Sequence, residues 1–179
     1  MCLTVRLPRK ITVCASIDLP NLSSANVDFL ISIADPDEVE PPLESFENAQ
    51  TLKLRFHDIT EPFYNLSAPR YSHIAALLDF GRSLGLSEGN HLVIHCNAGI
   101  CRSPAALLLL MAQAARDRSP EEVMAQMLKV APNAWPNILM VQLGDQLLDY
   151  NNRLVSAVTD YFETVYERYP DFARLMGRL

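Results

Sequence analysis

Apolar residues in the first half of the chain fall into short runs that have the length of strands. Residues 3–7, 11–16, 29–33 and 91–96 form such runs, and residues 51–56 alternate between polar and apolar as a half-buried strand does. Within residues 69–84, four residues recur at helical spacing: Ile74, Leu77, Leu78 and Gly81. A strand, a helix and a further strand in sequence predict a parallel pair joined by a crossover.

The second half of the chain is predicted to be helical. An apolar run begins at Ala105, and residues 119–129, 136–150 and 153–169 have a helical period. In the last of these, one stripe comprises Leu154, Val158, Tyr161, Phe162 and Val165. We expect this stripe to pack in the core, with a partner surface as the alternative. The predicted fold class is α/β, with a central, mostly parallel sheet flanked by helices and a helical C-terminal third.

Length and composition favour one domain over residues 1–179, with a helical extension from about residue 151. The 179 residues are 49% hydrophobic, enough to bury a core without disulfides or metals. Prolines and clustered charge exclude residues 35–42 from the central sheet, so they are expected to form a solvated loop or a short helix entry. No internal repeat or metal-ligand spacing appears, and we expect no cofactor.

The net charge of −6 is unevenly distributed. Residues 1–50 carry three basic and eight acidic side chains, residues 51–103 carry five and four, and residues 104–179 carry seven and nine. This balance argues against broad binding to nucleic acid or to anionic membranes. No apolar stretch reaches the length of a membrane span. The first residues lack the apolar segment of a signal peptide, so we expect a cytoplasmic protein with reduced cysteines. The sequence leaves the oligomeric state open.

Candidate chemistry concentrates in one segment, His95-Cys96-Asn97-Ala98-Gly99-Ile100-Cys101-Arg102-Ser103-Pro104. It lies between an apolar strand and an apolar helix, where backbone N–H groups and the helix dipole favour an anion. The same donors favour a thiolate, so Cys96 is expected to be nucleophilic near neutral pH. The Arg102 guanidinium can hold two oxygens of a phosphoryl group. Gly99 lacks a Cβ that would obstruct a positive φ or a close approach to the anion.

This segment resembles the phosphate-binding loop of the cysteine-dependent protein tyrosine phosphatases. The resemblance covers roughly residues 29–150 by element order, and Pro136-Asn137 and Gln142-Leu143 resemble a structural helix of the small dual-specificity group. It implies that the phosphate is bound by residues 97–102, namely Asn97, Ala98, Gly99, Ile100, Cys101 and Arg102. It also implies that Ser103 hydrogen-bonds the thiolate and eases its departure, and that His95 organises the loop. Locally, Ser103 and Pro104 also fit an N-cap and a first-turn proline.

Hydrolysis of a phosphate ester also needs a proton donor for the leaving oxygen. Phe56-His57-Asp58 follows a predicted strand, and Pro62 comes soon after, which resembles the acid loop of the small phosphatases. Asp58 is therefore the predicted general acid, and Glu61 is the alternative. The Trp-Pro-Asp sequence of the larger tyrosine phosphatases does not occur.

Cys96 and Cys101 with the following Arg102-Ser103-Pro104 also resemble the loop of low-molecular-weight phosphatases. Those enzymes carry the loop near the N-terminus and the acid near the C-terminus, whereas here Asp58 precedes the loop, as in the dual-specificity order. Two roles for Cys101 stay open. It can trap an oxidised Cys96 as a disulfide, or it can pack as a small apolar residue beneath the loop.

The predicted function is therefore a phosphatase that forms a cysteinyl-phosphate intermediate and hydrolyses phosphotyrosine, with phosphoserine and phosphothreonine as further candidates. Its partner would be a phosphorylated protein or a small phosphate ester. One alternative is a phosphate-binding module without turnover. Another is a phosphatase of phosphoinositides, although the loop lacks the lysines that a more highly charged substrate would favour.

Overall fold

The computed structural model describes residues 6–22, 26–39, 41, 43, 46–61, 63–84 and 90–178. Its strands are β1 (Lys10–Ala15), β2 (Phe29–Ala34), β3 (Gln50–Arg55) and β4 (His91–Cys96). A 3-10 helix, η1 (Ser16–Asn21), follows β1. The α-helices are α1 (Tyr71–Leu84), α2 (Arg102–Ala114), α3 (Pro120–Val130), α4 (Ile138–Leu147), α5 (Arg153–Arg168) and α6 (Pro170–Leu175).

The four strands form one parallel sheet in the order β1-β4-β2-β3. The predicted α/β class and parallel sheet are confirmed. The strands on either side of α1, which are β3 and β4, were predicted to pair with each other. This prediction is wrong, because β2 lies between them. All six residues of β2 and of β4 are buried, whereas β3 is partly exposed. The two fully buried strands therefore take the centre of the sheet, and the alternating strand takes an edge.

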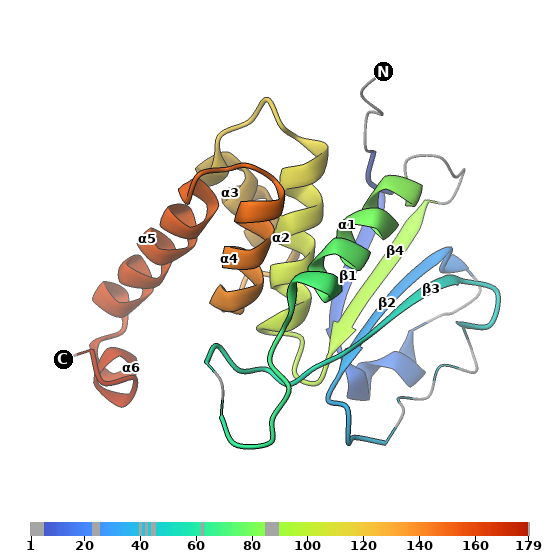
Figure 1. Cartoon of the computed structure of the whole chain (residues 1–179), viewed down its shortest axis with the longest axis horizontal. Coiled ribbons are helices and arrows are strands. Elements are labelled where there is room, and N and C mark those ends of the chain that lie inside the picture. Colours follow the sequence, from blue (N-terminus) through green and yellow to red (C-terminus); the bar gives the residue numbers. More distant parts are fainter. Residues whose placement is uncertain are drawn as a thin grey trace.

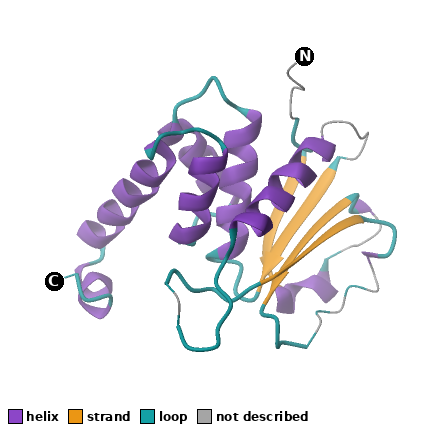
Figure 2. Ribbon diagram, in the orientation of Figure 1, coloured by secondary structure: helices purple, strands orange, loops and turns teal. Residues whose placement is uncertain are grey.

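The two faces of the sheet are covered differently (Figures 1 and 2). The α-helices gather on one face, where Phe29, Ile31 and Ile94 contribute to a large core shared with α1 to α6. On the other face, Leu30 and Val93 pack with a small cluster that includes Leu19 of η1. Successive residues of β2 and β4 therefore pack into clusters on opposite faces of the sheet, because side chains alternate between the two faces of a strand.

Most predicted helices are confirmed, with shifts at their ends. The helix predicted over residues 136–150 is shorter, because α4 begins only after Asn137, whose side chain accepts a hydrogen bond from Met140 N as an N-cap. The strand predicted over residues 3–7 is not seen in its described part, residues 6 and 7, and the rest lies outside the described residues. Neither η1 nor α6 was predicted.

The long helix α5 is fixed to the body of the fold at its beginning. Asn152, its N-cap, has φ +64° and makes no side-chain cap hydrogen bond. Instead, the buried carboxylate of Asp145 in α4 accepts hydrogen bonds from Asn152 N and Leu154 N at 2.7 and 2.8 Å. The predicted stripe follows from this placement: Leu154, Val158 and Phe162 are buried in the core, and Tyr161 and Val165 are half-buried. No helix in the described part of the chain is long and apolar enough to cross a membrane.

Candidate active site

The carboxyl ends of all four strands meet at one edge of the sheet, which is where parallel sheets place ligands. Cys96 ends β4, Ser16 follows β1, Asp35 follows β2, and Phe56 follows β3. Residues 97–101 form a loop at this edge that leads directly into α2. The predicted cradle and the predicted acid therefore lie at the same edge, although they come from distant parts of the sequence.

The loop curls tightly around Gly99. This residue has φ +72°, and a Cβ at this position would lie 2.7 Å from the carbonyl carbon of Cys14 and 2.8 Å from Ala15 N. The prediction that glycine is needed here because of a positive φ is confirmed. The close approach is to the backbone of β1, which the loop crosses. Any other residue would be strained here and would push the loop away from the sheet.

Three carbonyl groups of the loop accept hydrogen bonds from donors in the surrounding protein. Asn97 O accepts from Ser16 N at 3.2 Å, Ile100 O accepts from Trp135 N at 2.8 Å, and Cys101 O accepts from Asn137 N at 3.2 Å. Across a trans peptide bond, the next N–H points in the opposite direction. The amides of residues 98, 101 and 102 are therefore turned away from these donors, toward the inside of the curl, where they can bind an anion.

Cys96 lies at the bottom of this curl and is 1% exposed. Its Sγ lies 3.2 Å from Gly99 N, which donates to it, and 3.1 Å from Ser103 Oγ. The sequence-based assignment of Ser103 as an N-cap is wrong, because α2 begins at Arg102 and Cys101 occupies the N-cap position. Ser103 lies within the first turn, so its hydroxyl is free of a capping role and contacts the sulfur.

Arg102 is buried and held in a fixed orientation. Its Nη1 donates to Asp35 Oδ1 at 2.5 Å and to Phe56 O at 2.8 Å, so β2 and β3 both contribute to its position. Its Nε lies 3.7 Å from Asp58 Oδ2 and, within the described part of the chain, makes no hydrogen bond. This N–H can therefore donate to a phosphate oxygen bound between Arg102 and Asp58.

Asp58 lies at the rim of the cradle. Its Oδ1 accepts a hydrogen bond from Asn137 Nδ2 at 2.7 Å, and its side chain is 32% exposed, so it can exchange protons with solvent. The alternative acid, Glu61, is exposed on the same loop. The structure thus brings Asp58 to Arg102, and the described contacts of the cradle do not involve Glu61.

The loop that carries Asp58 is closed at its base by His57. His57 N donates to Ser67 O at 2.8 Å, and Ser67 N donates to His57 Nδ1 at 2.9 Å. Since Nδ1 accepts, the proton of a neutral ring is on Nε2, which lies 3.0 Å from Asp37 Oδ1. The ends of the loop that carries Asp58 are therefore joined, and this closure limits the positions that Asp58 can take.

The other predicted site residues lie around the cradle in different ways. Asn97 and Ala98 are exposed at its mouth, and Asn97 Nδ2 donates to Glu38 Oε1 at 2.9 Å. Ile100 is also exposed, at 42%. His95 is buried in β4 in register with Cys14 and Ser32, on the face of the sheet opposite Cys96.

The second cysteine of the loop, Cys101, is half-buried beside Asp58. Burial, together with the negative charge of Asp58, raises the pKa of the Cys101 thiol to about 12. Burial and the nearby Asp18 raise the pKa of Cys14 to about 12 as well. Both groups therefore remain protonated thiols at neutral pH, where they are poor nucleophiles. For Cys101 this favours the packing role over the redox role.

Two residues of the site were missed by sequence analysis. Asp35 was assigned only to an acidic loop, and Asn137 only to a structural helix. Asp35 carried a usable signal, because it directly follows a buried strand, as Cys96 ends one, and the carboxyl ends of parallel strands converge. Asn137 carried none, since its contact with Asp58 depends on how α4 packs. No group of three or more His, Cys, Asp or Glu suited to a metal ion occurs among the described residues.

This chain resembles solved structures of known proteins. No model of a known protein family matches the chain, and no curated protein matches it. Solved structures do match. DUSP15 is 19% identical with a TM-score of 0.58, and the match covers 87% of this chain and 94% of that one. Tk-PTP in its active form is 17% identical with a TM-score of 0.56, covering 83% and 99%. PTPMT1, solved in complex with PI(5)P, is 16% identical with a TM-score of 0.55, covering 85% and 96%.

The chain therefore has the fold of the small dual-specificity and protein tyrosine phosphatases, as the resemblance of the loop implied. The match extends over most of each of these chains. At 16% to 19% identity, the likeness concerns the fold. The chemistry of the site depends on the residues that this chain places there.

Proposed function

We propose that this protein is a cysteine-dependent phosphatase that hydrolyses phosphotyrosine in proteins, and that residues 1–179 form one phosphatase domain. The Cys96 thiolate attacks phosphorus, an S–P bond forms, and the bond from phosphorus to the tyrosine oxygen breaks. Asp58, in its protonated form, gives its proton to the departing oxygen. The amides of the loop and Arg102 stabilise the negative charge on the phosphoryl oxygens.

In the second step, a water molecule attacks the phosphocysteine. Asp58, now a carboxylate, takes a proton from the water, the S–P bond breaks, and inorganic phosphate and the Cys96 thiolate are released. The Ser103 hydroxyl, 3.1 Å from Sγ, donates to the sulfur as negative charge returns to it. The roles of Asn97, Ala98, Gly99, Ile100 and Cys101 are to bind phosphate through the backbone, and that of His95 is to support the loop from the opposite face of the sheet.

The observation that carries the proposal is the meeting of three groups from two distant segments. Asp58 Oδ2 lies 3.7 Å from Arg102 Nε, and Cys96 lies at the bottom of the curl that Arg102 closes. A module that only binds phosphate needs the amides and the arginine, but it gains nothing from a carboxylate beside the bound anion, which would repel it. The position of Asp58 therefore supports turnover over binding alone.

The proposal is tested by hydrolysis of nitrophenyl phosphate and of phosphotyrosine, phosphothreonine and phosphoinositide substrates, in the presence of a chelator. Cys96→Ser should abolish turnover and still bind vanadate, because the amide cradle remains. Cys14→Ser is the matched control, since Cys14 lies on β1 beneath the loop, and it should keep activity. Turnover by Cys96→Ser would exclude the proposed nucleophile. Binding of vanadate by the wild type without hydrolysis of any substrate would show a binding module.

A further inference from the structure

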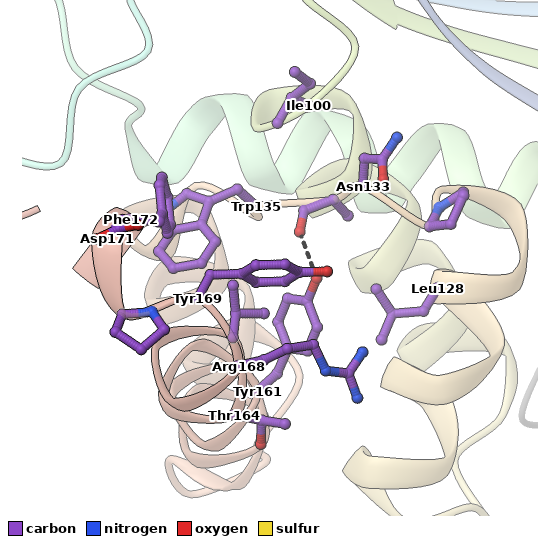
Figure 3. Close-up of a pocket in the computed structure, with 14 residues that line it drawn as sticks. Ile100, Leu128, Asn133, Trp135, Tyr161, Thr164, Arg168, Tyr169, Asp171 and Phe172 are labelled. Carbon is purple, nitrogen blue, oxygen red and sulfur yellow. Dashed lines mark hydrogen bonds between the residues drawn. The ribbon is translucent and has the colours of Figure 1, made fainter. Parts of the chain in front are cut away.

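A groove with a volume of about 1140 Å³ lies beside the loop that forms the phosphate cradle. Ile100 of the loop lies at one end of it, and Thr164 of α5 lies at the other (Figure 3). The peptide N–H of Trp135, another lining residue, donates to Ile100 O at 2.8 Å. Ile100 and Trp135 therefore connect the lining of the groove to the loop of the candidate active site.

The floor of the groove is a packed aromatic cluster. The Trp135 ring stacks on Phe162 with centroids 3.8 Å apart, and Phe172 of α6 meets Trp135 edge to face at 5.4 Å. Tyr161 is fixed because its hydroxyl donates to Ala134 O at 3.0 Å (Figure 3). These contacts make the floor rigid, which lowers the entropy cost of binding a ligand against it.

Large side chains nevertheless stay exposed along this surface. Tyr169, which lies across the middle of the groove in Figure 3, is 55% exposed, and Ile100 is 42% exposed. The rim also carries polar groups, among them Asn133, Thr164 and Arg168. Apolar side chains at the base with hydrogen-bonding groups at the edge suit an extended peptide, which presents side chains and backbone amides together.

We propose that this groove binds the polypeptide that flanks the phosphorylated residue, and that it selects substrates with large apolar side chains within about three residues of that residue. This inference rests on the proposed function. Tyr161, Val165 and Arg168 lie on successive turns of α5 and line the groove. Seven helical residues span about 10 Å, which is the length of about three extended residues.

A lipid substrate would also bring apolar groups to the cradle, but this surface suits it less well. The groove carries polar and charged groups on its rim, among them Asn133, Thr164 and Arg168, and acyl chains would offer these groups no hydrogen-bond partner. The protein has a net charge of −6, which opposes approach to an anionic membrane.

The test compares two phosphotyrosine peptides that differ only in having leucine or serine at the three residues on each side, with nitrophenyl phosphate as a substrate without flanking chain. Thr164→Glu places a carboxylate in the groove. Thr159→Glu is the matched control, because both threonines are exposed on α5, and each donates from Oγ1 to the carbonyl four residues before it, at 3.0 and 2.9 Å. Tyr169→Ser is a second variant that removes apolar surface.

The wild type should prefer the leucine peptide by about tenfold or more in kcat/KM, mainly through KM. Thr164→Glu and Tyr169→Ser should abolish this preference and leave nitrophenyl phosphate hydrolysis unchanged, while Thr159→Glu should change neither. Equal rates for the two peptides would overturn the proposal. So would a loss in Thr164→Glu that is the same for nitrophenyl phosphate and for the peptide.

Binding provides a readout that is independent of turnover. Trp135 is the protein's one tryptophan, so its fluorescence reports directly on the groove. The leucine peptide should change this fluorescence in Cys96→Ser and do so more weakly in Cys96→Ser with Thr164→Glu. If the peptide binds but no substrate is hydrolysed, the proposed phosphatase function is wrong, whereas the proposed binding of peptide in the groove is supported. If a short-chain phosphoinositide changes the fluorescence and the leucine peptide does not, the groove binds lipid and the proposal is wrong.

Discussion

The side chain of Asn137 donates a hydrogen bond to Asp58 Oδ1 at 2.7 Å, although the two residues are 79 positions apart. The backbone N–H of Asn137 also donates to Cys101 O at 3.2 Å, and its Oδ1 accepts from Met140 N at 3.0 Å. One residue therefore connects the proposed acid, the phosphate loop and the start of α4. Its contact with Asp58 makes it a candidate positioning residue.

We predict that Asn137→Ala lowers kcat about tenfold for alkyl phosphates, because Asp58 is no longer held over the leaving oxygen. The effect should be small for nitrophenyl phosphate, whose leaving group needs little protonation. Loss of the helix cap should also cost about 1 kcal/mol of stability. Asn137→Ser retains a capping oxygen but has no amide to reach Asp58, so it should recover the melting temperature and not the activity. Equal recovery of both would indicate a purely structural role.

Asp58→Asn should lower kcat by about 10²-fold to 10⁴-fold, the range of a general acid, without weakening the binding of phosphate or vanadate. The loss should grow as the leaving group becomes more basic. Steady-state kinetics over a series of aryl phosphates measure this dependence. Glu61→Gln on the same loop is the control and should be close to the wild type. If Glu61→Gln loses kcat and Asp58→Asn retains it, the general acid is Glu61.

Gly99→Ala should destabilise the protein and disrupt the cradle. The left-handed backbone alone costs about 1 to 2 kcal/mol for a residue with a Cβ, and this Cβ would also overlap Cys14 at 2.7 Å. Gly177 provides the control, because it has φ +69° and an added Cβ would meet no atom within 4 Å. Gly177→Ala should therefore show the conformational cost without the overlap. Urea denaturation and nitrophenyl phosphate assays should separate the two variants, and equal losses of stability would contradict this account of Gly99.

The free energy of unfolding should fall as pH rises from about 9 to 12. In the folded protein, the pKa values of the Cys14 and Cys101 thiols are raised from 9.0 to about 12, chiefly by burial. The unfolded chain therefore loses these protons first, so the stabilisation is complete below pH 9 and is lost above it. Denaturant titrations at several pH values measure the slope. Replacing both cysteines with alanine should make the slope shallower, with Tyr150, whose pKa burial also raises, contributing to the remainder.

The same raised pKa predicts that Cys101 protects Cys96 poorly against oxidation. After mild peroxide and then a dithiol, Cys101→Ser should recover activity to the same extent as the wild type, since a protonated thiol attacks a sulfenic acid slowly. Mass spectrometry of the loop peptide gives the direct measurement. Formation of a Cys96 to Cys101 disulfide, with better recovery of the wild type, would restore the redox role.

The sequence by itself determined the elements that depend on local pattern. Buried apolar runs predicted β2 and β4, helical spacing predicted α1 and α5, and Gly99 within the loop predicted a positive φ. It also predicted that Cys96 and Arg102 lie at the two ends of one tight curl, because five intervening residues between a strand and a helix leave little other choice. In each case the cause acts between residues that are close in sequence.

Only the tertiary structure decided how distant segments meet. Placing β2 between β3 and β4 brings Asp35 to Arg102, and the packing of α4 brings Asn137 to Asp58. It also decided that α5 and α6 extend the surface beyond Ile100 into a groove. Local patterns show which face of an element is apolar, but many packings bury the same faces. The choice among them depends on the shape of all the side chains together.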